Sequence, residues 1–156
     1  MFSSVQVEGT PRGVTQEDLN DLEEELATPM PSGYREYMST LGNGQLAGHI
    51  HIYTPSDILE GPWSMEKWKK RLREDGWEWD EELIDEERAE ECVFFGETAD
   101  GDELVFHPDD PEVIYLLPAE SATVRYVADG LFDALEVLME SPLGQTSGSW
   151  DFVPVP

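Results

Sequence analysis

The sequence is short of basic residues. Its 156 residues include 9 lysines and arginines against 35 aspartates and glutamates, which sets a formal net charge of −26. Nucleic acids are bound through clustered lysine and arginine side chains, so this balance excludes a nucleic-acid-binding role. A basic protein partner is favoured instead, because complementary fields speed encounter and set orientation. Solubility or a salty habitat would also account for the acidity, and net charge alone does not decide between these reasons.

Cysteine and long apolar runs are also scarce. Cys92 is the only cysteine, so no internal disulfide can form, which is usual in a reducing compartment. The longest apolar runs, "VFF" and "VIYLLP", are far too short to span a bilayer. The first residues, "MFSSVQVEGTPRG", have neither the basic nor the apolar region of a signal peptide. We therefore expect a soluble protein of the cytoplasm, with no membrane association.

Enough apolar material remains for one folded domain. Hydrophobic residues make up 39% of the chain and aromatic residues 10%, and the length suits a single core. We expect one domain over residues 1–156, with a core at about 15–139, a charged segment at 63–91 and an extended tail at 140–156.

Apolar spacing predicts two short helices near the N-terminus. Leu19, Leu22 and Leu26 recur at helical spacing and Thr15 stands where an N-cap is wanted, so residues 16–27 should be helical. The segment "TPMP" ends this helix, because proline cannot continue it. A second helix should start just after Pro31 and end at "GNG", where glycine suits a left-handed residue and a turn.

The second half of the chain is rich in predicted strands. A strand at "HIHIY" should be followed by strands at "CVFFGE", "DELVFH", "EVIYLLP" and "TVRYVA", with an Asp100-Gly101 hairpin turn. A last helix, capped by Asp129, should bury Leu131, Phe132, Leu135, Leu138 and Met139. The fold class is therefore α+β: an antiparallel meander covered by the N-terminal helix pair and the C-terminal helix.

Charge is concentrated in the segment 63–91. A short basic helix is expected at residues 64–73, with Trp63, Trp68 and Leu72 on its apolar side. The acidic run that follows, residues 78–91, has only a thin apolar stripe, so it should be partly helical and exposed. The sequence leaves open whether Lys67–Arg73 neutralises this run internally.

The acidic run and its tryptophans are the predicted partner-binding surface. Aromatic side chains supply contact area, and an acidic rim would select a basic partner, although packing in the core is the other role open to these tryptophans. The predicted partner-binding residues are Trp77, Glu78, Trp79, Asp80, Glu81, Glu82, Asp85, Glu86 and Glu87.

No complete catalytic or metal-binding set is recognisable in the sequence. His49 and His51 would share one face of a strand and could chelate a metal, but two ligands make no site, and His107 is a lone histidine. Cys92 follows two glutamates and begins an apolar strand, which suits a buried and inert thiol. We predict a protein that is not an enzyme and that needs no cofactor or metal.

One motif resembles a known family. The stretch "MPSGYREYM" at residues 30–38, followed by Gly42-Asn43-Gly44, is similar to the L-P-x-x-Y-R-x-F-L…N-G-G pattern of the SUKH superfamily. The later "FFGETADGDELVFHPDDPEVIYLL" resembles the meander of the same family, and the resemblance runs from about Thr15 to Met139. The family includes fungal cell-wall-assembly regulators and bacterial immunity proteins.

The resemblance implies a protein-binding module. The expected function is that of an immunity protein that neutralises a cognate toxin, a basic nuclease domain, through its acidic surface. The alternative is an intracellular scaffold or regulator that docks on signalling or cell-wall-assembly proteins. The identity of the partner and the oligomeric state are not determined by the sequence.

Overall fold

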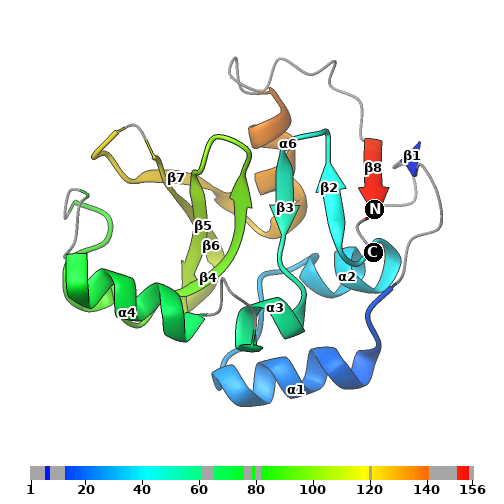
Figure 1. Cartoon of the computed structure of the whole chain (residues 1–156), viewed down its shortest axis with the longest axis horizontal. Coiled ribbons are helices and arrows are strands. Elements are labelled where there is room, and N and C mark those ends of the chain that lie inside the picture. The colour runs from blue at the N-terminus through cyan, green and yellow to red at the C-terminus, as the bar shows by residue number, and fades with distance from the viewer. Residues whose placement is uncertain are drawn as a thin grey trace.

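The N-terminal helix pair forms where apolar spacing and capping predict it. The computed structural model describes residues 6–7, 13–60, 65–75, 79, 82–119, 121–140 and 151–154. Helix α1 spans Gln16–Leu26 and helix α2 spans Tyr34–Thr40 (Figure 1). Thr15 caps α1, since its hydroxyl accepts a hydrogen bond from the Asp18 N–H at 3.2 Å. Gly42 follows α2 with a φ of 72°, as predicted.

Arg35 joins the two helices. Its guanidinium donates to Gln16 Oε1 at 2.9 Å and to Asn20 Oδ1 at 2.7 Å, and it forms an ion pair with Glu23. Glu23 also accepts a hydrogen bond from the Met30 N–H at 3.0 Å. One face of α1 is thus fixed against α2 and the connection between them.

The strands form a single mixed sheet. They are β1 (Gln6–Val7), β2 (Gly44–Leu46), β3 (Ile50–Ile52), β4 (Val93–Thr98), β5 (Glu103–His107), β6 (Asp110–Leu117), β7 (Arg125–Asp129) and β8 (Asp151–Pro154). Their order is β1-β8-β2-β3-β4-β5-β6-β7, and every neighbouring pair is antiparallel except β1 and β8. The predicted α+β class and the antiparallel meander are confirmed.

The tail contributes a strand that the sequence did not predict. Within the tail, residues 151–154 form β8, which lies between β1 and β2, and Phe152 is fully buried. A Cβ on Gly44 would lie 2.5 Å from Phe152 Cζ, so glycine is needed there to admit the ring. The expectation that Gly44 serves the turn is corrected: it is the first residue of β2. Trp150, in the same tail, lies outside the described residues.

Helix α3, Pro55–Glu60, was not predicted from the sequence either. It lies in the segment "TPSDILEGP", between the predicted strand at "HIHIY" and the predicted basic helix, where no element was expected. Pro55 occupies the first helical position, where its missing N–H costs no hydrogen bond. Thr54 and Asp57 form a reciprocal cap: the Asp57 N–H donates to Thr54 Oγ1 at 3.2 Å, and the Thr54 N–H donates to Asp57 Oδ2 at 3.3 Å.

The final helix, α6 at Leu131–Glu140, starts without the predicted cap. Asp129 is the last residue of β7, and its carboxylate accepts a hydrogen bond from the Tyr126 hydroxyl at 2.6 Å. Gly130, with a φ of 84°, makes the turn into the helix, and the Leu131 N–H donates to Ser32 O at 2.7 Å. The prediction of Asp129 as the cap is therefore wrong. Leu131 and Leu135 are buried as expected.

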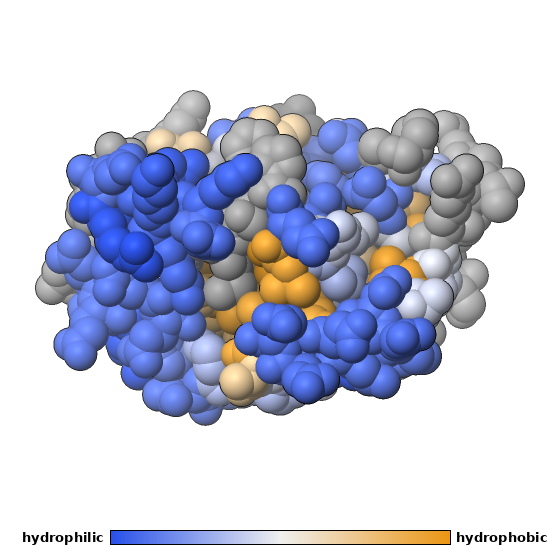
Figure 2. All heavy atoms as spheres, turned by 60° about the horizontal axis from the view of Figure 1, so that its bottom comes forward, coloured by the Kyte–Doolittle hydropathy of each residue, from blue (hydrophilic) through white to orange (hydrophobic). Residues whose placement is uncertain are grey.

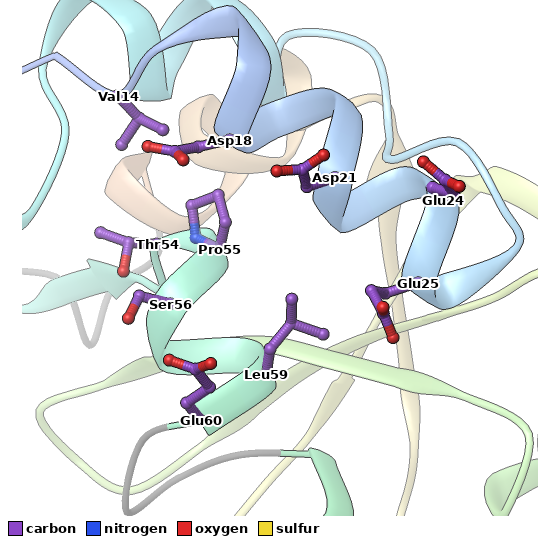
Figure 3. A pocket seen from close by; sticks show the side chains of 10 residues that line it. All are labelled: Val14, Asp18, Asp21, Glu24, Glu25, Thr54, Pro55, Ser56, Leu59 and Glu60. Carbon is purple, nitrogen blue, oxygen red and sulfur yellow. The ribbon is translucent and has the colours of Figure 1, made fainter.

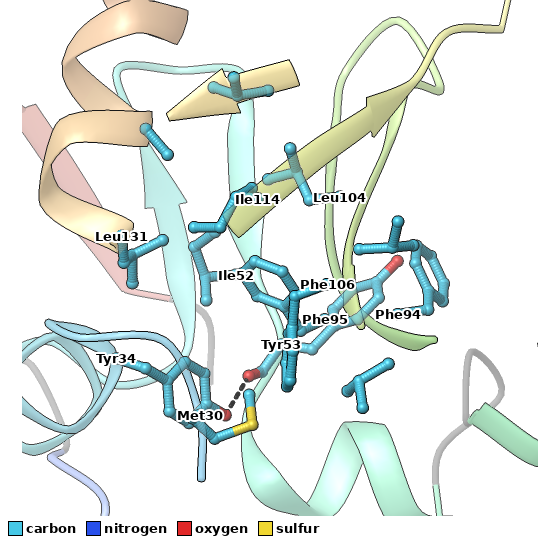
Figure 4. Packing of buried hydrophobic residues seen from close by; sticks show 14 of the residues in the cluster. Met30, Tyr34, Ile52, Tyr53, Phe94, Phe95, Leu104, Phe106, Ile114 and Leu131 are labelled. Atoms are coloured by element: carbon cyan, nitrogen blue, oxygen red, sulfur yellow. Dashed lines mark hydrogen bonds between the residues drawn. The ribbon is translucent and has the colours of Figure 1, made fainter. Parts of the chain in front are cut away.

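The core lies between the sheet and the helices. Figure 4 shows Tyr34 of α2 and Leu131 of α6 in one cluster with apolar residues of the sheet. The Tyr34 hydroxyl donates to the carbonyl oxygen of Tyr53 at 2.7 Å, so the one polar group of this ring is satisfied. That carbonyl directly precedes the cap of α3, so the bond also helps to position α3.

The basic helix α4, Met65–Asp75, is packed on the sheet. Trp68 is 3% exposed, stacks on Phe94 with ring centroids 5.5 Å apart, and donates its indole N–H to Glu103 Oε2 at 2.6 Å. Arg71 donates to the same oxygen at 2.8 Å. The apolar side predicted from Trp68 and Leu72 is confirmed, since both are buried; Trp63 lies outside the described residues. Among the helices that the structure describes, none has the length and apolar character to cross a bilayer.

Candidate partner-binding site

The acidic run is only briefly helical. Helix α5 covers Glu86–Ala89, and Asp85 caps it by accepting a hydrogen bond from the Arg88 N–H at 2.8 Å. Glu82, Glu86 and Glu87 are exposed to solvent. Four other predicted partner-binding residues lie outside the described part of the chain: Trp77, Glu78, Asp80 and Glu81.

Trp79 holds the charged segment against the sheet. Its side chain is half-buried and packs against the core, and its indole N–H donates to the carbonyl oxygen of Pro118 at 2.9 Å. The polar group of the ring is therefore already engaged within the chain. Only the exposed part of the ring is available to contact a partner.

Basic residues neutralise the acidic run in part. Arg73 of α4 lies 4.0 Å from Glu90, whereas Arg88, inside the run, lies 3.7 Å from Asp109, an acid outside the run. Among the described residues of Lys67–Arg73, Arg73 forms an ion pair with the run, and the charge of Lys69 interacts with those of Glu90 and Glu91. A shallow hollow of about 450 Å³ lies beside α5, and its lining residues are all acidic: Asp85, Glu86, Glu87 and Glu90.

A deeper groove lies between α1 and α3, which we call the α1–α3 groove. Its volume is about 900 Å³. It is lined by Val14, Asp18, Asp21, Glu24, Glu25, Thr54, Pro55, Ser56, Leu59 and Glu60. Figure 3 shows the acidic side chains in a row along α1, with Leu59 directed from α3 into the space between the helices.

The groove has an apolar floor. Val14 and Leu59 are half-buried and pack against the core, and Pro55 is buried. Figure 2, which brings the side with α1 forward, shows apolar atoms at the centre of this face, framed by hydrophilic residues. An apolar floor beneath a charged rim is the usual arrangement of a protein-binding surface.

The acidic rim of the groove is not neutralised by the described part of the chain. Its carboxylates belong to Asp18, Asp21, Glu24, Glu25 and Glu60, all of which are exposed. None of them forms an ion pair with a described residue, whereas Glu23, on the neighbouring face of α1, is paired with Arg35. Helix α1 therefore uses one face for internal contacts, and another face presents carboxylates that no described residue pairs with.

Sequence reasoning missed this groove, although two signals for it were present. Asp18, Asp21 and Glu25 are spaced at i, i+3 and i+7, which places them on one face of a helix. The "TPSD" stretch has a hydroxyl cap, a proline at the first helical position and an acid two residues later, which is a helix start. Their proximity could not be read from the sequence, because about thirty residues separate the two helices.

The histidines and the cysteine have structural surroundings. His49 Nδ1 lies 3.1 Å from Ala47 O and His51 Nε2 lies 2.9 Å from Asn43 Oδ1. Both residues are half-buried, but only His51 lies in β3, since His49 belongs to the turn before it. His107 is buried, and its Nδ1 accepts a hydrogen bond from the Asp109 N–H at 3.0 Å. Burial raises the pKa of the Cys92 thiol to about 12, so the predicted inert cysteine is confirmed as a buried one. No three histidine, cysteine or acidic residues of the described chain are grouped so that they could hold a metal.

Comparison with known families identifies the chain. The model of the SMI1/KNR4 family (SUKH-1) matches residues 13–136, a span that runs from the residues before α1 into α6. Comparison with curated proteins gives no significant match. Proteins of this family are in general non-enzymatic immunity or regulator proteins. The chain belongs to the SMI1/KNR4 family (SUKH-1), and this membership supports a protein-binding role of the toxin-immunity or SMI1/KNR4-like kind.

Proposed function

We propose that this protein is an immunity protein that binds a cognate bacterial toxin, a basic nuclease domain, in the cytoplasm and blocks it. The observation that carries the proposal is the net charge of −26 on a chain of this family. A surface of that sign attracts a protein whose own function requires a cationic face.

Blocking would follow from competition for the same cationic groups. A nuclease binds phosphates with lysine and arginine side chains. Carboxylates that pair with those side chains leave no room for the nucleic acid and give the complex a matching electrostatic pattern. The acidic residues of the run, with Glu82, Asp85, Glu86 and Glu87 in its described part, belong to the proposed contact surface together with Trp77, Glu78, Trp79, Asp80 and Glu81. This mode of action needs neither a catalytic step nor a cofactor.

The test is recovery of the partner followed by a salt titration. The protein is co-expressed with the products of neighbouring genes, and the complex is purified and assayed for inhibition of nuclease activity. We expect the Kd of the complex to rise by at least about tenfold between low and moderate salt, because contacts among exposed charges are screened. An affinity that does not change with ionic strength would reject the electrostatic part of the proposal.

A second candidate is favoured by the same family match. Proteins of this family include regulators, so an intracellular scaffold that docks on signalling or cell-wall-assembly proteins is the alternative. The two are separated by gene context and by the number of partners. A single toxin gene next to this gene supports the immunity protein, whereas several unrelated partners and no adjacent toxin support the scaffold.

A further inference from the structure

We propose that the α1–α3 groove is the docking site for a cationic segment of the partner, and that this segment places one apolar side chain between lysines or arginines. The inference rests on the basic partner of the proposed function and specifies where and how it binds. The groove floor, its rim and the rigidity of its walls each contribute to the argument.

The floor selects an apolar side chain. Leu59 and Val14 each bury one side against the core and present the other to the groove. Apolar surface at the base of a concave site adds to the affinity in proportion to the area that a ligand covers. Interfaces obtain most of their affinity from such anchors at their centre. A purely polar peptide would leave this floor exposed to water, so only the screened attraction of the acidic rim would contribute to its affinity.

The rim selects positive charge on both sides of that anchor. Asp18, Asp21 and Glu25 stand along α1, and Glu60 faces them from α3 (Figure 3). They are spread along the groove, and no group of them within the described chain converges on one point as metal ligands do. Several separate cations, such as lysine and arginine side chains, therefore match the rim better than one metal ion. A second copy of this chain is disfavoured as the occupant, because it would bring another 26 units of net negative charge.

The walls of the groove are held in place before any partner arrives. Thr15 caps α1 and Arg35 clamps its far face, while Thr54 and Asp57 cap α3. The Tyr34 hydroxyl fixes the carbonyl that precedes α3. A preformed site loses little conformational entropy on binding, so more of the contact energy appears as affinity.

The hollow beside α5 lacks these features. Its lining residues are all acidic, and Glu90, one of them, lies 4.0 Å from Arg73. That surface can attract a cation at long range but offers no apolar anchor. We therefore assign docking of the segment with the apolar anchor to the groove, and purely electrostatic contact with other cationic side chains of the partner to the acidic run.

The experiment uses two synthetic probe peptides and the full-length protein. One peptide has lysines on both sides of a central leucine; the matched peptide has serine in place of that leucine. Binding is measured by calorimetry, and the contact surface is mapped by amide chemical-shift changes. We expect the leucine peptide to bind at least about threefold more tightly, and its largest shift changes to lie in α1 and α3, because only that peptide can cover the floor.

Charge-matched variants locate the site. The groove variant carries Asp18→Asn, Asp21→Asn and Glu25→Gln; the control carries Asp100→Asn, Asp133→Asn and Glu136→Gln, which belong to neither acidic surface, so both variants remove the same charge. All six residues are exposed, so both variants should fold. We expect the groove variant to weaken binding of the leucine peptide by about tenfold and the control by less than about twofold, because close pairs are lost only in the first.

A third variant tests the floor. The Leu59→Ser variant should bind the leucine peptide only as tightly as it binds the serine peptide. Its affinity for the serine peptide should equal that of the unaltered protein. If this variant does not fold, the shift map of the unaltered protein decides the same point.

Three outcomes would overturn the inference: equal binding of the two peptides, equal losses in the two charge variants, or shift changes confined to the acidic run. These failures are distinct from failure of the proposed function. A recovered toxin that binds the groove variant normally and still shows salt dependence would refute only the groove, whereas a chain that recovers no basic partner would refute the function.

Discussion

The α1–α3 groove and the acidic run carry charge of the same sign but differ in construction. The groove lies between two capped helices and has half-buried Val14 and Leu59 beneath its carboxylates. The described run depends on the short helix α5, and its hollow is lined by acids alone. Charge density along the chain therefore does not locate the surface with the best shape for a partner. An apolar floor held between fixed walls does, since affinity comes from covered apolar area as well as from charge.

The largest expected effect concerns the attachment of the charged segment. Replacing Trp68 by alanine removes its stack with Phe94 and the donor to Glu103, so we expect the free energy of unfolding to fall by about 3–5 kcal/mol. Urea unfolding measures this loss. Native-state hydrogen exchange should show α4 and α5 losing more protection than α1 if the two regions are as distinct as their construction indicates.

The Trp68→Phe variant is the control for this prediction. It retains an aromatic ring against Phe94 but loses the indole donor and part of the buried ring system, so a smaller loss of about 1–3 kcal/mol is expected. Equal losses in the two variants would show that the hydrogen bond to Glu103, and not the stacking, attaches α4.

The next effect concerns the wall of the groove. Tyr34→Phe leaves the carbonyl oxygen of Tyr53 without its buried donor, and we expect a loss of about 1–3 kcal/mol in the free energy of unfolding. Tyr126→Phe is the matched control: Tyr126 is 54% exposed and its hydroxyl bonds to Asp129 at the surface, so the change should stay within about 0.5 kcal/mol. If both substitutions lower the free energy of unfolding by the same amount, the buried hydrogen bond of Tyr34 does not help to position α3.

A smaller effect is expected from the cap of α3. Asp57→Ala removes one half of the reciprocal cap with Thr54 and should lower the free energy of unfolding by about 1 kcal/mol. Hydrogen exchange of the α3 amides should rise as well, while those of α1 stay protected. Ser56→Ala, on an exposed position of the same helix, serves as the control and should change neither quantity.

The smallest expected effect is a pH dependence of the free energy of unfolding, which arises from the Glu103 carboxyl beneath α4. Burial raises the pKa of the Glu103 carboxyl above its ordinary value, and the Arg71 charge together with the hydrogen bonds from Trp68 and Arg71 offset part of this shift. A folded pKa above the unfolded one means that the native state holds the proton more tightly, so stability from this group is present at low pH and is lost as pH rises through the folded pKa.

The Glu103→Gln variant measures this term, because glutamine cannot ionise. Its free energy of unfolding relative to the unaltered protein should increase between about pH 4 and pH 7, the range above the ordinary pKa of glutamate. A relative stability that decreases over this range would mean that Arg71 and Trp68 outweigh burial and lower the pKa.

Local sequence patterns predicted those elements whose apolar spacing, cap or turn residues lie within the element itself. The leucine spacing and the Thr15 cap were sufficient for α1, and the Asp100-Gly101 pair was sufficient for the hairpin between β4 and β5. Helix α3 was missed because a helix this short offers too few apolar positions to show a period. Strand β8 was missed because it is stabilised by β2, more than a hundred residues earlier, and by the space that Gly44 leaves for Phe152.

The sequence by itself determined the charge of −26, the impossibility of an internal disulfide, the positions of the periodic helices and strands, and the motifs that resemble the family. These properties follow from composition and from spacing over a few residues. Only the tertiary structure decided that Asp18, Asp21 and Glu25 would face Glu60 across an apolar floor, that Trp79 would be turned onto Pro118, and that the tail would complete the sheet. The physical reason is that such contacts join residues far apart in the chain, and their geometry is set by how the whole core packs.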